Sequence, residues 1–292
     1  MTLIRAAAPT DMDAIRAIAA SFDLLDSWPG APDYLDLERD AGRLVVADGE
    51  GAVAGFAGTL TRGRLTHLGD LFIDPATQSA GLGGRLLDAV LSSPHSASGA
   101  DSRSGADSGS GQGAGAGAAV VTFASSDPRA LALYLRHGLR PRLPVWYLRG
   151  NATSLPEPAV DIRPATAGEI ASLDAEIGGG RRAGQLAWYL GLPGAAAWAT
   201  PDGYAVTRLV GDRCVLGPAG GHDPAASVRA AIAAARLAAD ERRPVHVAVF
   251  ATHPLAVALV GAGFHIVDHD TFMATPAADL DTDRYIPHPD LG

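Results

Sequence analysis

The sequence predicts a mixed α/β fold that is built twice along one chain. Segments typical of strands and helices alternate, the pattern of the first half returns in the second, and 292 residues suffice for two domains of about 140 residues each. Apolar residues make up 47% of the chain, so each half can bury a core of its own. We therefore expect two similar mixed α/β domains in tandem, packed together as a pseudo-dimer.

The first half contains the elements of one such domain in order. A strand over residues 2–7 leads into a helix that starts near Pro9 or Thr10, where the threonine can cap it. An irregular acidic stretch over residues 20–41 precedes two strands joined by "DGEG", which favours a hairpin. A strand over residues 65–74, a glycine-rich loop over residues 78–84 and a helix that ends near residue 91 are expected next. A strand over residues 119–125, a helix over residues 128–137 and a strand over residues 144–149 complete the half.

The second half repeats this order in compressed form. "VDIRPATAGEIASLDAEIG" parallels "TLIRAAAPTDMDAIRAIAASF", and "GYAVTRLVGDRCVLGP" supplies a hairpin and a central strand. Residues 92–118 are rich in Ser, Gly, Ala and Asp and predict a flexible insertion, whereas residues 150–159 contain two prolines and predict a linker. The expected domains are residues 1–149 and 160–292.

Composition and charge exclude several classes of function. The net charge is −9 and no basic stripe is present, which argues against nucleic acid as a partner. No apolar stretch has the length of a membrane span, and the N-terminus does not resemble a signal peptide. The single cysteine, Cys214, fits a reducing compartment and is expected to be a buried thiol. We expect a cytoplasmic monomer or homodimer.

A glycine-rich stretch, "QSAGLGGRLL", follows the apolar strand "LFIDP" at residues 78–87. Glycine costs about 1 kcal/mol relative to alanine inside a helix, so Gly81, Gly83 and Gly84 suggest that the backbone approaches a ligand closely. Unpaired amides at the start of a helix bind phosphate groups. The alternative is a glycine-rich turn that binds nothing.

A second motif lies downstream in "SSDPRALALYLRHGL". Ala130 and Tyr134 lie one turn apart on one face of the expected helix, which begins at Asp127 and ends at Gly138, a natural left-handed C-cap. The glycine spacing of dinucleotide-binding folds and the lysine of a P-loop are both absent.

The two motifs in this order resemble the GNAT family of N-acetyltransferases. Residues 78–83 match the family's Gln/Arg-x-x-Gly-x-Gly/Ala loop at every fixed position. The family's later helix, Asn-x-x-Ala-x-x-x-Tyr-x-x-x-Gly-Phe, is matched at Ala130, Tyr134 and Gly138, with aspartate at 127 and leucine at 139. With the repeat, the whole chain resembles tandem GNAT proteins.

The resemblance implies acetyl-CoA as co-substrate and no metal. It implies that a small amine attacks the thioester directly, without a covalent enzyme intermediate. The pyrophosphate would lie on the loop amides and the pantetheine along the central strand. The residues so implied are Leu71, Phe72, Ile73, Gln78, Ser79, Ala80, Gly81, Leu82, Gly83, Gly84, Asp127 and Ala130.

The resemblance also implies the catalytic groups. Tyr134 aligns with the tyrosine that protonates the departing thiolate, although a tyrosine that only packs is the alternative. His67 in "LTHLGDLFI" best matches the position of the family's glutamate base, with Asp70 as a second candidate. A lone strand histidine with a structural role remains the other interpretation.

The acceptor is expected against "SFDLLDSWPGAPDYLDLERD". Asp26, Trp28 and Tyr34 could receive a cationic amine there, and solvated helix ends are the alternative. In the second half, Pro224 and Ala226 stand where the first has Gly81 and Gly83, and Leu259 stands where it has Tyr134. We therefore expect one active site, in the first half. A non-catalytic acyl-CoA-binding protein is the rival hypothesis.

Overall fold

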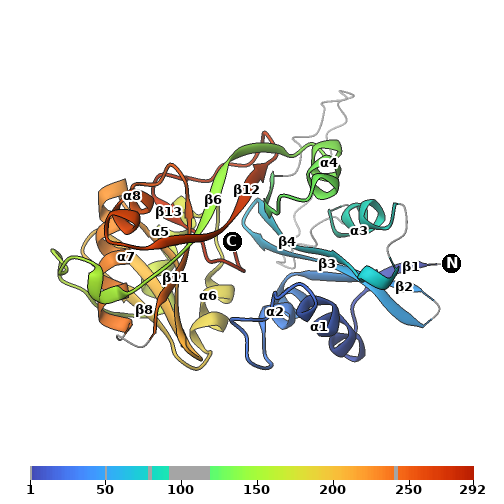
Figure 1. Ribbon diagram of the computed structural model, residues 1–292, viewed down its shortest axis with the longest axis horizontal. Helices are drawn as coiled ribbons and strands as arrows, with labels where there is room; N and C mark the ends of the chain where they lie inside the picture. The colour runs from blue at the N-terminus through green and yellow to red at the C-terminus, as the bar shows by residue number, and fades with distance from the viewer. Residues whose placement is uncertain (1, 50, 78–80, 92–118, 240–242) are drawn as a thin grey trace, which may run out of the picture.

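The computed structural model describes residues 2–49, 51–77, 81–91, 119–239 and 243–292 (Figure 1). The insertion expected at residues 92–118 lies outside the described residues. Within them, thirteen strands form one mixed sheet that runs through both halves. The elements of the first half are β1 (Leu3–Ala6), α1 (Met12–Ala20), α2 (Tyr34–Ala41), β2 (Arg43–Gly49), β3 (Ala52–Arg62), β4 (Leu65–Ile73), α3 (Leu82–Leu91), β5 (Ala119–Ala124), α4 (Pro128–Arg136) and β6 (Arg140–Gly150).

The second half has the same elements in the same order, followed by a short tail strand. They are β7 (Arg163–Ala165), α5 (Ala167–Ile177), α6 (Ala183–Leu190), β8 (Ala195–Ala199), β9 (Gly203–Val210), β10 (Arg213–Gly221), α7 (Pro224–Ala238), β11 (Val245–Phe250), α8 (Pro254–Gly261), β12 (His265–Ala274) and β13 (Tyr285–Ile286). Both halves contain one parallel strand pair, β4 with β5 and β10 with β11. The mixed α/β fold and its internal repeat are confirmed.

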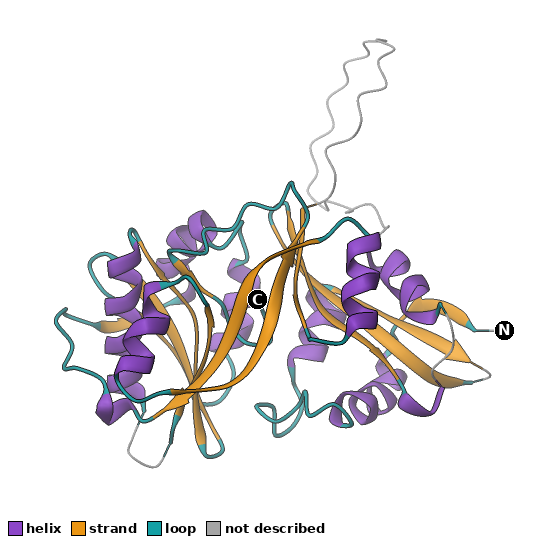
Figure 2. Cartoon of the chain, turned by 45° about the horizontal axis from the view of Figure 1, so that its top comes forward, coloured by secondary structure: helices purple, strands orange, loops and turns teal. Residues whose placement is uncertain are grey.

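The two halves exchange their last long strands. β12 of the second half pairs with β5 of the first, and β6 of the first half pairs with β11 of the second. β6 and β12 also pair with each other, and they run side by side from one half to the other (Figures 1 and 2). Each half therefore completes its sheet with a strand of the other half.

The core follows this arrangement. Figure 1 shows α1 and α2 on one face of the first half's sheet and α3 and α4 on the other. One apolar cluster joins the α1 and α2 face to the second half, since it contains Phe56 of β3 together with Tyr204 of β9 and Phe250 of β11. Separate clusters lie beneath α3 and α4 and beneath α7 and α8. The halves thus share a core as well as a sheet.

The stretch over residues 20–41 is more regular than expected, because it contains α2. Asp33 accepts hydrogen bonds from the backbone N–H groups of Leu35 and Asp36, and the Asp36 carboxylate accepts one from the N–H of Asp33. This reciprocal capping box was visible in the sequence. Helix α4 ends at the expected place: His137 is its C-cap, and Gly138 follows with φ of +86°, a left-handed conformation. Cys214 is buried, as expected.

The tail after β12 returns to the junction of the halves, where the C-terminus lies (Figure 1). The carbonyl oxygen of Gly292 accepts hydrogen bonds from Arg62 of β3, from Arg182 and from the hydroxyl of Tyr285. Arg182 also forms a buried ion pair with Asp174 of α5 at 2.7 Å. This network holds residues 285–292 between the two halves.

Candidate active site

The first half has a central opening where strands β4 and β5 diverge. The two strands pair only from Leu65 to Leu68 of β4, and Thr122 closes the last pair by donating to the carbonyl of Leu68 at 2.8 Å. On the other edge, β4 stays paired with β3 but shifts register at Gly69, because Thr59 faces Leu68 while the adjacent Gly58 faces Asp70. A β-bulge therefore lies where the strands diverge.

A cavity of about 1010 Å³ fills this opening. Its wall combines both halves: the α1–α2 connection, β4, α3, α4, β5 and β6 from the first, and β12 and the tail from the second. Leu71, Phe72 and Ile73, which have no strand partner on the β5 side among the described residues, lie along it. This edge fits an extended pantetheine chain, whose amide groups can pair with strand backbone.

Most of the residues expected to bind acetyl-CoA line this cavity. Besides the β4 residues they are Gly81, Gly83, Gly84, Asp127 and Ala130. Leu82 differs, because its side chain is 3% exposed and packs in the core under α3. Gln78, Ser79 and Ala80 lie outside the described residues.

The glycines leave room at the start of α3. Gly81 has φ of +89°, a conformation that disfavours other residues. A Cβ atom on Gly83 would lie 3.4 Å from Leu133 Cδ2 and 3.5 Å from Ile73 Cδ1, so its absence keeps the gap between α3, α4 and β4 open. The helix N-terminus beside this gap suits the pyrophosphate.

Asp127 has a local structural role as well. Its carboxylate caps α4 by accepting from the N–H of Arg129 at 2.8 Å, and it pairs with the Arg129 guanidinium at 2.9 Å. Both residues line the cavity. Capping alone explains an aspartate at this position, so its contact with acetyl-CoA stays a prediction.

Tyr134 lies in the cavity wall on α4 with 7% of its surface exposed. Burial raises the pKa of its phenol above the usual value, and the nearby carboxylates of Asp70 and Asp270 raise it further. The phenol is therefore protonated throughout the physiological range. It can donate a proton but cannot act as a base.

His67 also lines the cavity, but its environment disfavours a proton. Burial lowers the pKa of the imidazole to about 3, and the charges of Arg62 and Arg182 contribute. Its ring packs edge-on against Phe123 at 5.2 Å, and Nδ1 has no hydrogen-bond partner among the described residues. Such an imidazole stays neutral at physiological pH and cannot hold a proton taken from an ammonium group.

Asp70 forms a buried carboxyl pair with Glu38 of α2. Burial raises the pKa of Glu38 well above its usual value, and the charge of Asp70 adds to this rise. Burial raises the pKa of Asp70 to about 7, although hydrogen bonds from Glu38 and Tyr34 oppose the rise. Neither Glu38 Oε2 nor Asp70 Oδ2 has another partner among the described residues. The pair therefore holds a proton at neutral pH.

Two glycines make room for this pair. A Cβ atom on Gly58 would lie 1.7 Å from Glu38 Oε2, and one on Gly69 would lie 2.7 Å from Glu38 Oε1. Both glycines belong to the bulged segment of β3 and β4. The bulge that opens the cavity thus also admits the Glu38 carboxyl behind Asp70.

Two of the three expected acceptor residues line the cavity. Asp26 and Tyr34 do, and the Tyr34 hydroxyl donates to Asp70 Oδ1 at 3.2 Å. Trp28 is buried behind the wall, between the rings of Tyr34 and Tyr189 and under the guanidinium of Arg208. Its indole N–H donates to Asp290 at 2.9 Å, so it supports a lining residue and does not itself face the cavity.

The cavity contains further polar residues that the sequence analysis did not single out. Tyr147 of β6 donates to Asp270 of β12 at 2.7 Å, and Asp268 and Asp290 complete this side. Only the capping box around Asp33 could have pointed to Glu38, by predicting α2. Nothing in the sequence indicates that β12 and the tail reach the first half, because that placement depends on the strand exchange.

The equivalent opening of the second half is closed. β10 pairs with β11 from Cys214 to Leu216, and the tail strand β13 then pairs with β10 at Ala219 and Gly220. The N-terminus of α7 is capped by Asp223, which accepts from the N–H of Ala226 at 2.7 Å. In the second half, the strand edge of β10 and the N-terminus of α7 are therefore occupied by other parts of the chain, whereas their counterparts in the first half are accessible. Leu259, at the position of Tyr134, is buried.

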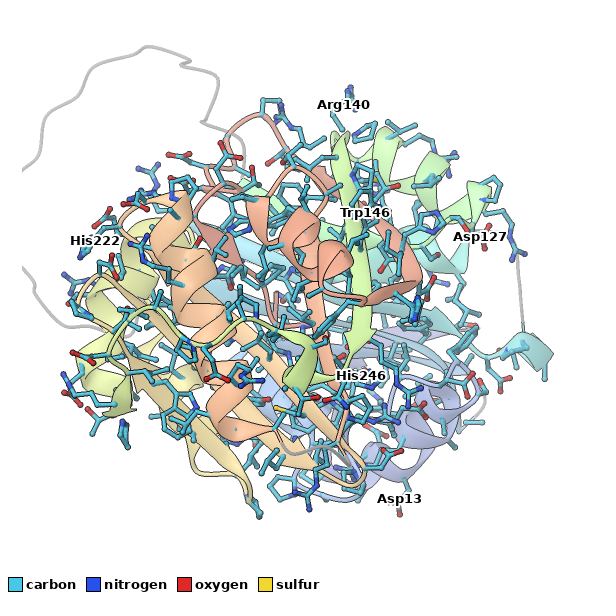
Figure 3. All side chains as sticks on the ribbon, turned by 60° about the vertical axis from the view of Figure 1, so that its left-hand side comes forward. Asp13, Asp127, Arg140, Trp146, His222 and His246 are labelled. Atoms are coloured by element: carbon cyan, nitrogen blue, oxygen red, sulfur yellow. The ribbon has the colours of Figure 1, made fainter. Side chains whose placement is uncertain are left out.

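His253 and Ser227 of the second half do not form an activated serine. His253 Nδ1 accepts from the N–H of Leu255, so its Nε2 carries the proton and donates to Ser227, the reverse of an activated serine. His222 and His246 lie far apart (Figure 3). Across the described ranges, His, Cys, Asp and Glu form no group of three suited to a metal, and no helix is long and apolar enough to cross a membrane.

Comparison with known proteins agrees with this geometry. Residues 34–103 match the family described as acetyltransferase (GNAT) domain. This range runs from α2 through β4 and past the end of α3, and it includes Tyr34, Glu38, Asp70 and the glycine-rich loop. No curated protein matches the sequence.

Solved structures share the fold along the whole chain. A putative acetyltransferase from Pyrococcus horikoshii is 16% identical with a TM-score of 0.70, covering 100% of this chain and 96% of its own. A GCN5-related N-acetyltransferase from Kribbella flavida is 18% identical with a TM-score of 0.56, covering 94% and 70%. A tandem GNAT protein from the clavulanic acid biosynthesis pathway is 14% identical with a TM-score of 0.57, covering 96% and 100%. Together with the domain match in the first half, these likenesses show that the chain has the fold of tandem GNAT proteins, as its sequence motifs indicated.

Proposed function

We propose that this protein transfers the acetyl group of acetyl-CoA to the amino group of a small amine, at one site in the cavity of the first half. The observation that carries the proposal is that a proton acceptor and a proton donor, Asp70 and Tyr134, line the same cavity beside the free edge of β4. When bound, acetyl-CoA supplies a thioester that an amine can attack directly.

Asp70 is the proposed base, in place of His67. An amine attacks only in its neutral form, so a base must remove a proton from the ammonium form. A carboxylate whose pKa is about 7 accepts that proton at neutral pH, whereas an imidazole whose pKa is about 3 does not. The Tyr34 hydroxyl holds the Asp70 carboxylate by a hydrogen bond.

Tyr134 is the proposed acid. Its phenol is protonated and faces the cavity, so it can donate its proton to the departing thiolate of CoA. The backbone at the Gly69 bulge is the proposed donor to the oxyanion that develops on the thioester carbonyl, because a bulge frees amides from the strand ladder.

The rival function is acyl-CoA binding without catalysis, and Tyr134 separates the two. Replacing Tyr134 by Phe should leave acetyl-CoA binding intact but slow turnover of an amine by ~10²-fold or more. Unchanged turnover would end the assignment of Tyr134 as the acid. Binding is checked by the melting temperature, since acetyl-CoA at 100 times its Kd stabilises by about 2.7 kcal/mol. A folded protein that shows no shift would contradict both functions.

A further inference from the structure

The lining of the cavity is divided by charge. Arg129 and Arg136 are the cations among the described lining residues, and both belong to α4. Away from α4 the wall carries carboxylates from the α1–α2 connection, β4, β12 and the tail, namely Asp23, Asp26, Asp70, Asp268, Asp270 and Asp290. The phosphates of a CoA ester suit the α4 side, so the acidic side remains for the acceptor.

Three of these carboxylates belong to the second half. Asp268 and Asp270 reach the cavity because β12 pairs with β5. Asp290 reaches it because the tail, fixed by β13 and by the contacts of Gly292 with Arg62 and Arg182, passes between the halves. The half whose own opening is closed thus builds part of the acceptor wall.

These carboxylates gather around two phenols. Tyr147 donates to Asp270, and the charges of Asp270, Asp290 and Asp268 raise the pKa of Tyr147 after burial has raised it. The charge of Asp270 also raises the pKa of Tyr134, as the charge of Asp70 does. Asp270 is therefore close to the proposed acid, and Asp290, whose charge raises the pKa of Asp70, is close to the proposed base.

Within the described part of the chain, few positive charges face the carboxylates of the second half from the cavity side. His67, 3% exposed in the wall, is neutral, and its Nδ1 lacks a partner among the described residues. Arg208 attracts Asp290, but it lies over Trp28 at 4.5 Å and does not line the cavity. Asp270 and Asp290 are half-buried, and Asp268 is exposed. Half-buried carboxylates without a facing cation are disfavoured, and a cationic ligand relieves this.

We propose that the acceptor is an amine with a second cationic centre, and that Asp270 and Asp290 bind this second centre while Asp70 meets the reacting amine. The inference rests on the proposed function, because it names the class of acceptor used at that site. It assigns specificity to two residues of the second half.

The test compares three amines of equal chain length: butylamine, diaminobutane with an amine at each end, and aminobutanoate, which ends in a carboxylate. CoA release should give a kcat/KM about 30-fold higher for diaminobutane than for butylamine, as expected for a charge-assisted contact. Aminobutanoate should be the poorest. Raising the salt concentration should reduce the preference.

Asp270→Asn and Asp290→Asn should each reduce the ratio of diaminobutane to butylamine turnover to a few-fold. Asparagine can still accept from Tyr147 or Trp28, so both variants keep their hydrogen bonds. Asp13→Asn is the matched control, since Asp13 is exposed on α1, far from Asp127 (Figure 3), and should leave the ratio unchanged. If one variant fails to fold, the other decides.

Calorimetry on the CoA-bound protein separates the two proposals. Tighter binding of diaminobutane than of butylamine without any CoA release would contradict amine acetylation but support a dicationic ligand. Equal affinities and equal turnover would overturn the inference and leave the proposed function standing. A preference that persists in both Asn variants would show that Asp270 and Asp290 do not bind the second centre.

Discussion

Replacing Asp70 by Asn removes one ionisable group from the buried pair with Glu38 and should change activity and stability in opposite directions. Burial raises the pKa of Asp70 from 3.8 to about 7. In the folded protein this carboxyl keeps its proton up to about pH 7, whereas in the unfolded chain it ionises near pH 4. Between these values the folded state binds one more proton, so the free energy of unfolding of the wild type falls as pH rises, by ~1.4 kcal/mol per pH unit.

The Asn variant lacks this titration, so it should gain stability relative to the wild type as pH rises from 4 to 7, with no further gain above. Urea unfolding of both proteins at several pH values measures the difference. Activity should follow the opposite course. The kcat/KM of the wild type should fall about tenfold per pH unit below 7, and the variant should lose ~10²-fold or more at pH 8.

Two results would refute this reasoning. A stability difference that does not change with pH would show that Asp70 titrates normally in the folded state. Wild-type turnover by the variant at pH 8 would show that Asp70 is not the base. Asp13→Asn, the same change on the exposed face of α1, is the control in both measurements and should alter neither profile.

Further consequences concern the pocket behind Asp70, the junction of the halves and the closed second site. Gly58→Ala places a Cβ atom 1.7 Å from Glu38 Oε2, so it should displace the Glu38 carboxyl. Both kcat/KM and the melting temperature should fall. An unaltered kcat/KM would show that the position of Glu38 does not matter for activity. Arg182→Met leaves Asp174 buried without its ion pair and should cost about 3–5 kcal/mol in urea unfolding, whereas Arg163→Ala, at an exposed pair, should have no measurable effect. Calorimetry should find one acetyl-CoA per chain, and two would contradict the closure of the second half by β13.

The sequence by itself determined the elements and their repetition, because both depend on local information. Alternation of apolar residues, turn glycines and caps act within a few residues, so β4, α3 and α4 begin and end close to the expected positions. The proposed acetyl-CoA residues also fall in two short stretches, which local spacing brings to one strand edge and two helix ends. Helix α2 was missed although its capping box was present, because the acidic stretch resembled a loop.

Only the tertiary structure decided the character of the proposed reaction centre. The neutral state of His67 depends on burial and on Arg62 and Arg182, and the proton held by Glu38 and Asp70 depends on packing between α2 and β4. The acidic wall proposed to bind the acceptor depends on strand exchange, which brings Asp270 beside Tyr147, 123 residues earlier in the chain. The protonation states of these side chains follow from desolvation, and their proximity follows from strand pairing between distant segments. The local pattern of residues determines neither.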